Sequence, residues 1–279
     1  MRQLLSALLL VPFLSASYAT YDGARVHYES YGKGTDAIVF IHGWTCDLTF
    51  WRGQAPVYEK RRSLLVDLPG HGQSEKPDVP YTQERFARGV EAVMRAAGVE
   101  RAVVVGHSMG GPVALTFLRL FPAKTRALVL VDAYLQQEPR NDQERTQKKL
   151  MDGFAARWRA PNYKESASSM IDSMFSDKTT ASQREQIREK MLTAPQYVMA
   201  SAFEGMMGME PLKPGETYAL PVLAIMADRS GNLGGYEAQL RGVFPNLRYE
   251  SWQGAGHFLM MESPDRFNRT LEDFLAGVN

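Results

Sequence analysis

One serine of this chain lies in a setting that would expose its hydroxyl for nucleophilic attack. Ser108 is the centre of Gly-His-Ser-Met-Gly at 106–110, directly after the apolar run 102–105 and directly before a helical pattern. A sharp turn from strand to helix strains the backbone at the serine, and the flanking glycines remove side chains that would collide there. The following helix N-terminus adds free N–H groups and partial positive charge. The pentapeptide alone is common, so the interpretation depends on the partners that a serine nucleophile needs.

A serine hydroxyl needs a base within hydrogen-bonding reach, and the chain has five histidines. His27 falls within a strand pattern, and His71 falls in what we interpret as a surface turn. His42 and His107 stand beside glycines, where we expect structural roles. The remaining histidine, His257, follows the last strand pattern in a glycine-flanked loop and precedes the last helical pattern. We therefore predict that His257 is the base.

The base needs a carboxylate that fixes its tautomer and stabilises the imidazolium. Two aspartates, Asp132 and Asp228, end strand patterns at the edge where Ser108 is expected. Asp228 gives the order Ser, Asp, His along the chain and ends the strand pattern preceding the one that leads to His257. We assign Asp228 as the acid and keep Asp132, at the entry to a long insertion, as the alternative. We expect Glu262 to brace the last helix.

The negative charge that develops on the substrate oxygen needs preorganised donors. The backbone N–H of Met109, the residue after the serine, is the first candidate. The second is Trp44, which follows His-Gly at the end of the apolar run 36–43. Its ring either lines the pocket or packs in the core. We interpret Cys46, which lacks a base partner of its own, as a small apolar residue near the site.

The elements that must hold these groups alternate between strand and helix patterns. The range 24–32 alternates in character as a half-buried strand does. Five continuous Val/Ile/Leu runs occur at 36–43, 62–70, 101–108, 126–133 and 221–228, and such runs are typical of parallel strands covered on both faces. A sixth, more polar run occurs at 247–254. Amphipathic helical patterns occur at 81–98, 110–122 and 263–278. We predict an α/β fold with a mostly parallel sheet flanked by helices.

The range 134–218 interrupts this alternation, because it has no strand pattern. It is charged at first and then amphipathic. It contains eight methionines, which suit adaptable apolar surfaces, at positions 151, 170, 174, 191, 199, 206, 207 and 209. We predict a helical insertion over the sheet, with about half of these methionines in its own core and the rest lining a pocket roof. The core domain then comprises 20–133 and 219–279.

The first 19 residues resemble a secretory signal peptide. Arg2 precedes the apolar run 4–14, which is too short to cross a bilayer because a spanning helix needs roughly 20 apolar residues. Small residues at Ser17 and Ala19 predict cleavage near Ala19 and export to the periplasm or the medium. An exported chain whose only cysteine is Cys46 has no internal disulfide.

Composition and motifs exclude several classes of function. The 279 residues include 32 basic and 31 acidic residues, a net charge of +1, and no basic run with interleaved aromatics, which argues against nucleic acid as a partner. The sequence has no H-E-x-x-H motif and no cysteine pair that would indicate a metal site, and it has no P-loop or G-x-G-x-x-G motif that would indicate a nucleotide cofactor. We therefore expect neither metal nor cofactor. Nothing in the sequence indicates the oligomeric state.

From about Tyr21 onward the chain resembles the α/β-hydrolase family. The resemblance rests on FIHGWTCDLTFW, LLVDLPGHGQSEKP, VVVGHSMGGPVAL, AIMADRS and GAGHFLMMESPDRFN, in that order. It implies that the insertion 134–218 is a helical cap between the sixth and seventh strands, and that the His-Gly loop before Trp44 supplies an oxyanion donor. Family members that cleave epoxides or carbon–halogen bonds carry aspartate where Ser108 stands, so the resemblance disfavours those activities.

These observations predict a hydrolase of carboxylic esters that forms an acyl-enzyme on Ser108, with His257 as base and Asp228 as orienting acid. The expected substrate is a small ester with an apolar acyl or aryl group. The same triad would also serve a hydrolase of C–C bonds, lactones or amides, or a perhydrolase of the cofactor-free haloperoxidase type. A binding module without catalysis is the remaining alternative, and the complete triad argues against it.

Overall fold

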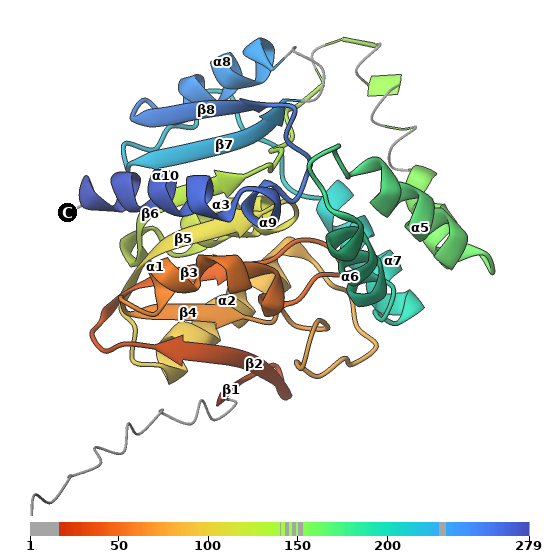
Figure 1. The fold of residues 1–279 in the computed structure, drawn as a ribbon, viewed down its shortest axis with the longest axis horizontal. Coiled ribbons are helices and arrows are strands. Elements are labelled where there is room, and N and C mark those ends of the chain that lie inside the picture. Colours follow the sequence, from red (N-terminus) through yellow and green to blue (C-terminus); the bar gives the residue numbers. More distant parts are fainter. Residues whose placement is uncertain are drawn as a thin grey trace, which may run out of the picture.

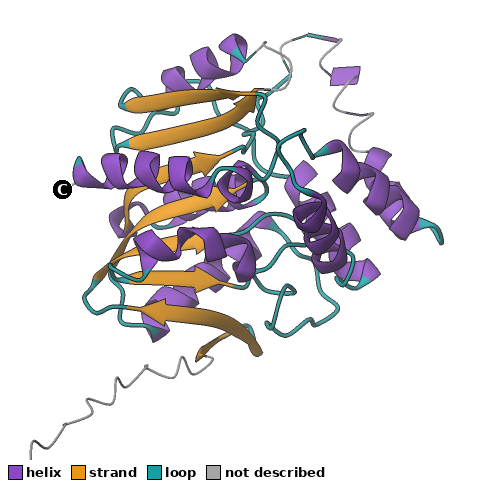
Figure 2. Cartoon of the chain, in the orientation of Figure 1, coloured by secondary structure: helices purple, strands orange, loops and turns teal. Residues whose placement is uncertain are grey.

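The computed structural model describes residues 17–139, 141–142, 145–146, 149, 153–228 and 233–278. Within these residues the chain forms an eight-stranded sheet with helices on both faces (Figures 1 and 2). The predicted α/β class is therefore confirmed. The signal peptide prediction falls mostly on residues 1–16, outside the described residues. None of the described helices is long and apolar enough to cross a membrane.

The strands lie in the order β1-β2-β4-β3-β5-β6-β7-β8. Their bounds are β1 Ser17–Tyr21, β2 Ala24–Tyr31, β3 Asp36–Ile41, β4 Ser63–Val66, β5 Arg101–His107, β6 Thr125–Val131, β7 Val222–Asp228 and β8 Leu247–Gln253. The pairs β1–β2 and β2–β4 are antiparallel, and every other pair is parallel. Every strand predicted from the sequence is present. The edge strand β1 lies where the leader was expected, and cleavage after Ala19 would fall within it.

The core helices lie between successive strands, except α9 and α10, which follow the last strand. Their bounds are η1 Leu48–Gln54, α1 Ala55–Tyr58, α2 Gln83–Ala96, α3 Gly110–Leu120, η2 Pro122–Lys124, α8 Gly234–Val243, α9 Leu259–Glu262 and α10 Pro264–Ala276. Helices α2 and α3 pack together on one face of the sheet, and α1 and α10 cover the other (Figure 1). The sequence patterns predicted α2, α3 and α10, whereas η1, α1 and α8 were not predicted.

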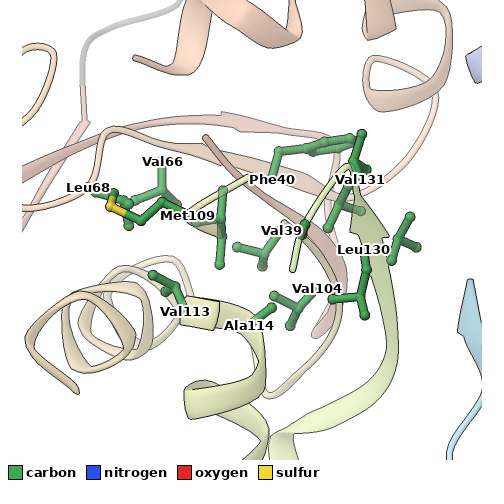
Figure 3. Packing of buried hydrophobic residues seen from close by; sticks show 14 of the residues in the cluster. Val39, Phe40, Val66, Leu68, Val104, Met109, Val113, Ala114, Leu130 and Val131 are labelled. Carbon is green, nitrogen blue, oxygen red and sulfur yellow. The ribbon is translucent and has the colours of Figure 1, made fainter. Parts of the chain in front are cut away.

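Packing between the central strands and α3 fixes the position of that helix. Figure 3 shows Val39 of β3, Val104 of β5 and Leu130 of β6 close to Val113 and Ala114 of α3, and all five side chains are fully buried. Complete burial of one such valine or leucine stabilises the fold by about 1.5–3 kcal/mol. The first residues of α3 are therefore held rigidly at the carboxyl ends of β3, β5 and β6.

A helical segment separates β6 from β7. Its described elements are η3 Ala155–Arg159, α5 Tyr163–Ser173, α6 Ala181–Met191 and α7 Gln196–Met207. In Figure 1 they lie beside the carboxyl edge of the sheet, and we call residues 153–218 the cap. The indole N–H of Trp44 donates to the carbonyl of Met199 in α7 at 2.8 Å, and the hydroxyl of Ser201 accepts from the N–H of Tyr81 at 2.9 Å. These bonds fasten the cap to the core. The exact domain boundaries stay a prediction.

Candidate active site

Ser108 occupies a strained turn between β5 and α3. Its φ is +52°, a left-handed conformation that residues other than glycine seldom adopt. Its N–H donates to the carbonyl of Val131 in β6, and its own carbonyl accepts from Gly111, both at 2.9 Å. A Cβ at Gly106 would collide with the carbonyl of Gly110, and one at Gly110 would lie 2.5 Å from the Ile41 carbonyl. Only glycine fits at these two positions.

The ring of His257 is held by a buried carboxylate, that of Asp132. His257 Nδ1 lies 2.6 Å from Asp132 Oδ2, and the Asp132 side chain is fully buried. The other carboxylate oxygen, Oδ1, accepts from the N–H of Ala227 at 3.0 Å. This arrangement leaves Nε2 of His257 to face a proton donor.

The structure thereby corrects the assignment of Asp228 as the residue that orients His257. The carboxylate of Asp228 accepts from the hydroxyl of Ser251 at 3.1 Å instead. The strand register supplies the reason. His107 is paired with Val131, so Ser108 and Asp132 are the next residues of adjacent strands. In β7 the partner of Val131 is Ile225, so Asp132 is level with Met226. Asp228 lies two residues further on, roughly 7 Å along the strand at ~3.3 Å per residue.

The backbone of His257 is held from two further sides. Its N–H donates to the carbonyl of Met174 in the cap at 2.9 Å. Its carbonyl accepts from Nε2 of His107, also at 2.9 Å. Burial and the neighbouring His257 lower the pKa of His107 well below its usual value, so this ring is a neutral structural donor. Among the described residues no hydrogen bond joins Ser108 Oγ to His257, and catalytic contacts of this kind are often long before substrate binds.

The other histidines are structural. His42 Nδ1 donates to the Gly43 carbonyl at 2.8 Å, and its Nε2 accepts from the N–H of Leu68 at 3.0 Å. His27 pairs with the buried Asp67 at 2.7 Å. The expectation of a surface turn at His71 is wrong, because its side chain is 2% exposed. The turn folds inward, and His71 Nδ1 donates to the Pro69 carbonyl at 3.0 Å.

Trp44 and Met109, the predicted oxyanion donors, both lie near Ser108 in the backbone. A Cβ at Gly43 would lie 3.0 Å from the Cβ of Ser108, so the loop that continues into Trp44 passes directly beside the serine. Within the described part of the chain, the backbone N–H groups of Trp44 and Met109 donate to no protein acceptor. The Met109 side chain is buried near Val66 and Leu68 (Figure 3), so it offers the site its backbone alone. The Trp44 ring lines a small cavity and packs against Trp158 and Phe203.

Several residues around this site have a strained, left-handed backbone conformation. The described residues other than glycine with positive φ are Asp22, in the hairpin between β1 and β2, and three at the carboxyl edge: Thr45, Ser108 and Asp132. Such conformations cost of order 1–3 kcal/mol each and cluster at functional sites.

A cavity of about 380 Å³ opens above Ser108. Its described lining residues are Ser108, Pro112, Asp132, Tyr134, Met170, Ser173, Met174, Met206 and His257. A smaller cavity of about 20 Å³ reaches Gly43, Trp44, Cys46 and Met191. Burial raises the pKa of the Cys46 thiol well above its usual value, which makes it unreactive.

The described methionines of the cap lie either beside the two cavities or in the buried core. Met170, Met174, Met191 and Met206 line the two cavities. Met199 and Met209 are buried in the core, and Met207 is partly buried. Residue 151 lies outside the described residues. Among the residues that the structure describes, no group of three or more His, Cys, Asp or Glu side chains could hold a metal ion.

The chain belongs to the alpha/beta hydrolase fold family, whose model matches residues 36–264. It is 28% identical over 269 residues to a 2-hydroxy-6-oxononadienedioate/2-hydroxy-6-oxononatrienedioate hydrolase of Paraburkholderia phymatum, covering 90% of this chain and 91% of that protein. It is 27% identical over 269 residues, 93% of this chain and 69% of the relative, to the dihydrolipoyllysine-residue acetyltransferase component of the acetoin cleaving system of Cupriavidus necator.

Other matches are shorter or structural. Uncharacterised proteins of Mycobacterium tuberculosis and Mycobacterium bovis are 37% identical over 117 residues, which is 42% of this chain and 34% of theirs. A solved thermophilic esterase from Thermogutta terrifontis superimposes with a TM-score of 0.79 at 25% identity, covering 95% of this chain and 99% of that one. The family and these neighbours support a hydrolase enzyme.

Proposed function

We propose that the chain hydrolyses carboxylic esters through an acyl-enzyme. The observation that carries the proposal is the arrangement at the carboxyl edge. Ser108 and His257 line one cavity, and the buried carboxylate of Asp132 lies 2.6 Å from the far nitrogen of the His257 ring. A strained serine, a histidine base and a buried acid are the groups that acyl transfer needs.

The proposed reaction has two halves. Ser108 Oγ attacks the ester carbonyl while His257 takes its proton, and Asp132 stabilises the imidazolium. The backbone N–H groups of Trp44 and Met109 donate to the oxyanion. His257 then protonates the leaving alcohol, and a water that His257 activates releases the acid from Ser108.

The cavity favours an uncharged, apolar acyl or aryl group. Three methionines and Tyr134 lie on its wall, and its described lining contains no lysine or arginine. The Paraburkholderia relative is named for a dioate, a dianion that a cation would stabilise in a buried site. A neutral ester therefore fits the described lining better than a dicarboxylate C–C substrate.

Export of the chain, expected from residues 1–19, forms part of this proposal. Cleavage near Ala19 would remove the first three residues of β1. Thr20 and Tyr21 would remain, paired with Arg25 and Ala24 of β2.

The test compares two serines that line the same cavity. Ser108→Ala is expected to lower kcat on p-nitrophenyl esters by at least about 10⁴-fold, since loss of a serine nucleophile has cost on the order of 10⁶ elsewhere. Ser173→Ala, which removes a hydroxyl bound to the Met170 carbonyl at 2.7 Å, is the matched control and should stay within about threefold of the parent. Phenylmethanesulfonyl fluoride should add one sulfonyl group at Ser108.

Full esterase activity in Ser108→Ala would refute the proposal. Lactones, amides, a dienedioate and hydrogen peroxide with acetate, run beside the ester panel, identify the alternative chemistries. A higher kcat/KM on any of these than on every ester would replace the ester assignment.

A further inference from the structure

The cap and the loop that carries His257 share one carboxylate, that of Glu262 at the end of α9. Its Oε1 accepts hydrogen bonds from the hydroxyls of Ser176, at 3.0 Å, and Thr179. Its Oε2 accepts from the backbone N–H of Gly256 at 2.7 Å. Ser176 and Thr179 lie between α5 and α6 in the cap. One side chain therefore joins the cap to the residue directly before His257.

The backbones of the same two segments lie in direct contact. The N–H of His257 donates to the Met174 carbonyl at 2.9 Å. A Cβ at Gly256 would collide with Glu262 Oε1 and lie 2.9 Å from the N of Ser176. Only glycine lets the segments approach this closely. We call Glu262, Gly256, Ser176 and Thr179 the clamp.

The clamp lies beside the substrate cavity through Met174. The side chain of Met174 lines the cavity above Ser108, while its carbonyl holds the backbone of His257. Two outer bonds extend the contact: Gln183 Nε2 donates to the Met261 carbonyl at 2.7 Å, and Lys178 Nζ donates to the Gln253 carbonyl at 3.2 Å. A shift of the cap at Met174 would move the base and the cavity wall together.

We propose that Glu262 is a positioning residue that sets the orientation of His257 and the shape of the cavity wall at Met174 at the same time. The proposal rests on the proposed function, because the position of His257 matters for rate only if His257 is the base. It replaces the expectation that Glu262 only braces the last helix, since the three hydrogen bonds that its side chain makes with the described residues lead to other segments.

Glu262→Gln tests the clamp with almost no change in shape. The carboxylate accepts at both oxygens, whereas an amide presents one oxygen and one NH₂ group. Either the Gly256 N–H must then face the NH₂ group, or the two hydroxyls must change from donating to accepting, although each already accepts from a backbone N–H, that of Ser176 at Thr179 and that of Lys178 at Ser176. Hydrogen bonds to charged groups are worth about 1.5–3 kcal/mol, so kcat is expected to fall by roughly 10- to 100-fold. The ratio of kcat/KM between short and long acyl chains should change as well, because the wall at Met174 moves.

The control is Glu272→Gln in α10, where the carboxylate faces Arg61 at 3.4 Å on the surface. It should leave both kcat and acyl preference unchanged. Thr179→Val removes one donor to Glu262, and its effect should be non-additive with that of Glu262→Gln, because both changes break the same contact. Glu262→Gln with parental kcat and parental acyl preference, even with a lower Tm, would overturn the proposal.

A measurement without substrate separates this proposal from the esterase assignment. Amide hydrogen exchange of Gly256 and His257 should be at least about tenfold faster in Glu262→Gln than in the parent, since the N–H groups lose their ordered acceptors. Unchanged exchange at both amides overturns the clamp. A parent enzyme that hydrolyses no ester overturns the proposed function, while the exchange rates still decide whether Glu262 holds the junction.

Discussion

Replacing Asp132 with asparagine is the sharpest perturbation of the site, because the structure fixes how the new amide would sit. In the parent, Asp132 Oδ1 accepts from the N–H of Ala227 at 3.0 Å, and Oδ2 lies 2.6 Å from His257 Nδ1. Asparagine keeps its oxygen at the Ala227 N–H and turns its NH₂ group toward His257. Nδ1 then becomes an acceptor, and the ring proton moves to Nε2. His257 can no longer take a proton from Ser108.

The size of the effect follows from the lost charge. Two unit charges about 4 Å apart attract by about 4 kcal/mol at an effective dielectric constant of ~20. Each 1.36 kcal/mol is a factor of ten in rate, so losing this stabilisation of the imidazolium costs about 10³-fold. The wrong tautomer adds to this, and the same replacement in a serine protease triad costs about 10⁴-fold. We expect kcat for Asp132→Asn to fall by roughly 10³- to 10⁴-fold.

The assay is initial-rate hydrolysis of a short p-nitrophenyl ester, with active sites counted by fluorophosphonate titration. Asp228→Asn is the matched control, since Asp228 ends the neighbouring strand and contacts Ser251. It should retain at least about one third of the parental kcat, because the hydrogen bond to His257 Nδ1 comes from Asp132. If Asp228→Asn loses as much as Asp132→Asn, or if Asp132→Asn stays within tenfold of the parent, the reasoning from strand register is refuted.

Two further predictions concern stability. Burial lowers the pKa of His71 from 6.5 to about 3, so the unfolded chain binds its proton at a higher pH than the folded chain does. The free energy of unfolding should therefore fall as the pH drops from about 6.5 to about 3, by at most about 5 kcal/mol from this group. His71→Gln should make the urea midpoint depend less on pH over this range. An unchanged pH dependence would contradict the lowered pKa of His71. The Cβ of Gly106→Ala would collide with Gly110, so this variant should have a lower Tm and no activity. Gly242→Ala in α8 has open space around its Cβ and should raise the free energy of unfolding by about 0.5–1 kcal/mol. Parental activity in Gly106→Ala would contradict the close approach of Gly106 to Gly110.

The features that the sequence predicted correctly carry local signals. The buried strands are continuous apolar runs, and the turn at Ser108 is marked by glycines that the close approach of α3 requires. The prediction that His257 is the base was made by elimination among five histidines. The prediction that Trp44 supplies an oxyanion donor came from the loop that follows β3. Each of these inferences needs only the chain near the residue and the rule that parallel strands end at one edge.

The carboxylate that contacts His257 could not be chosen in this way. Asp132 and Asp228 both lie between Ser108 and His257 in the chain, so chain order did not discriminate between them. The choice depended on the pairing of His107 with Val131 and of Val131 with Ile225, which no local pattern encodes.

The contacts of Glu262 were equally hidden, because its cap partners lie 83 and 86 residues away in the chain. The cap pattern predicted helices but not the short segment between α5 and α6 that reaches the His257 loop. The inward fold of the turn at His71 was missed for a related reason. A polar, glycine-rich turn predicts an exposed loop, and the sequence pattern does not show whether other loops cover it.

The strain at the site depends on the same register that selects Asp132. Ser108 and Asp132 both have positive φ, and each is the first residue beyond the paired part of its strand. Their N–H groups remain bound to the next strand, Ser108 to Val131 and Asp132 to Ile225. Neither residue can relax without breaking a bond at the end of the buried sheet. A roughly 1–3 kcal/mol distortion at each position is therefore sustained by the packed strands below. Ser108 and Asp132 keep fixed directions because the core, and not the loop itself, holds them.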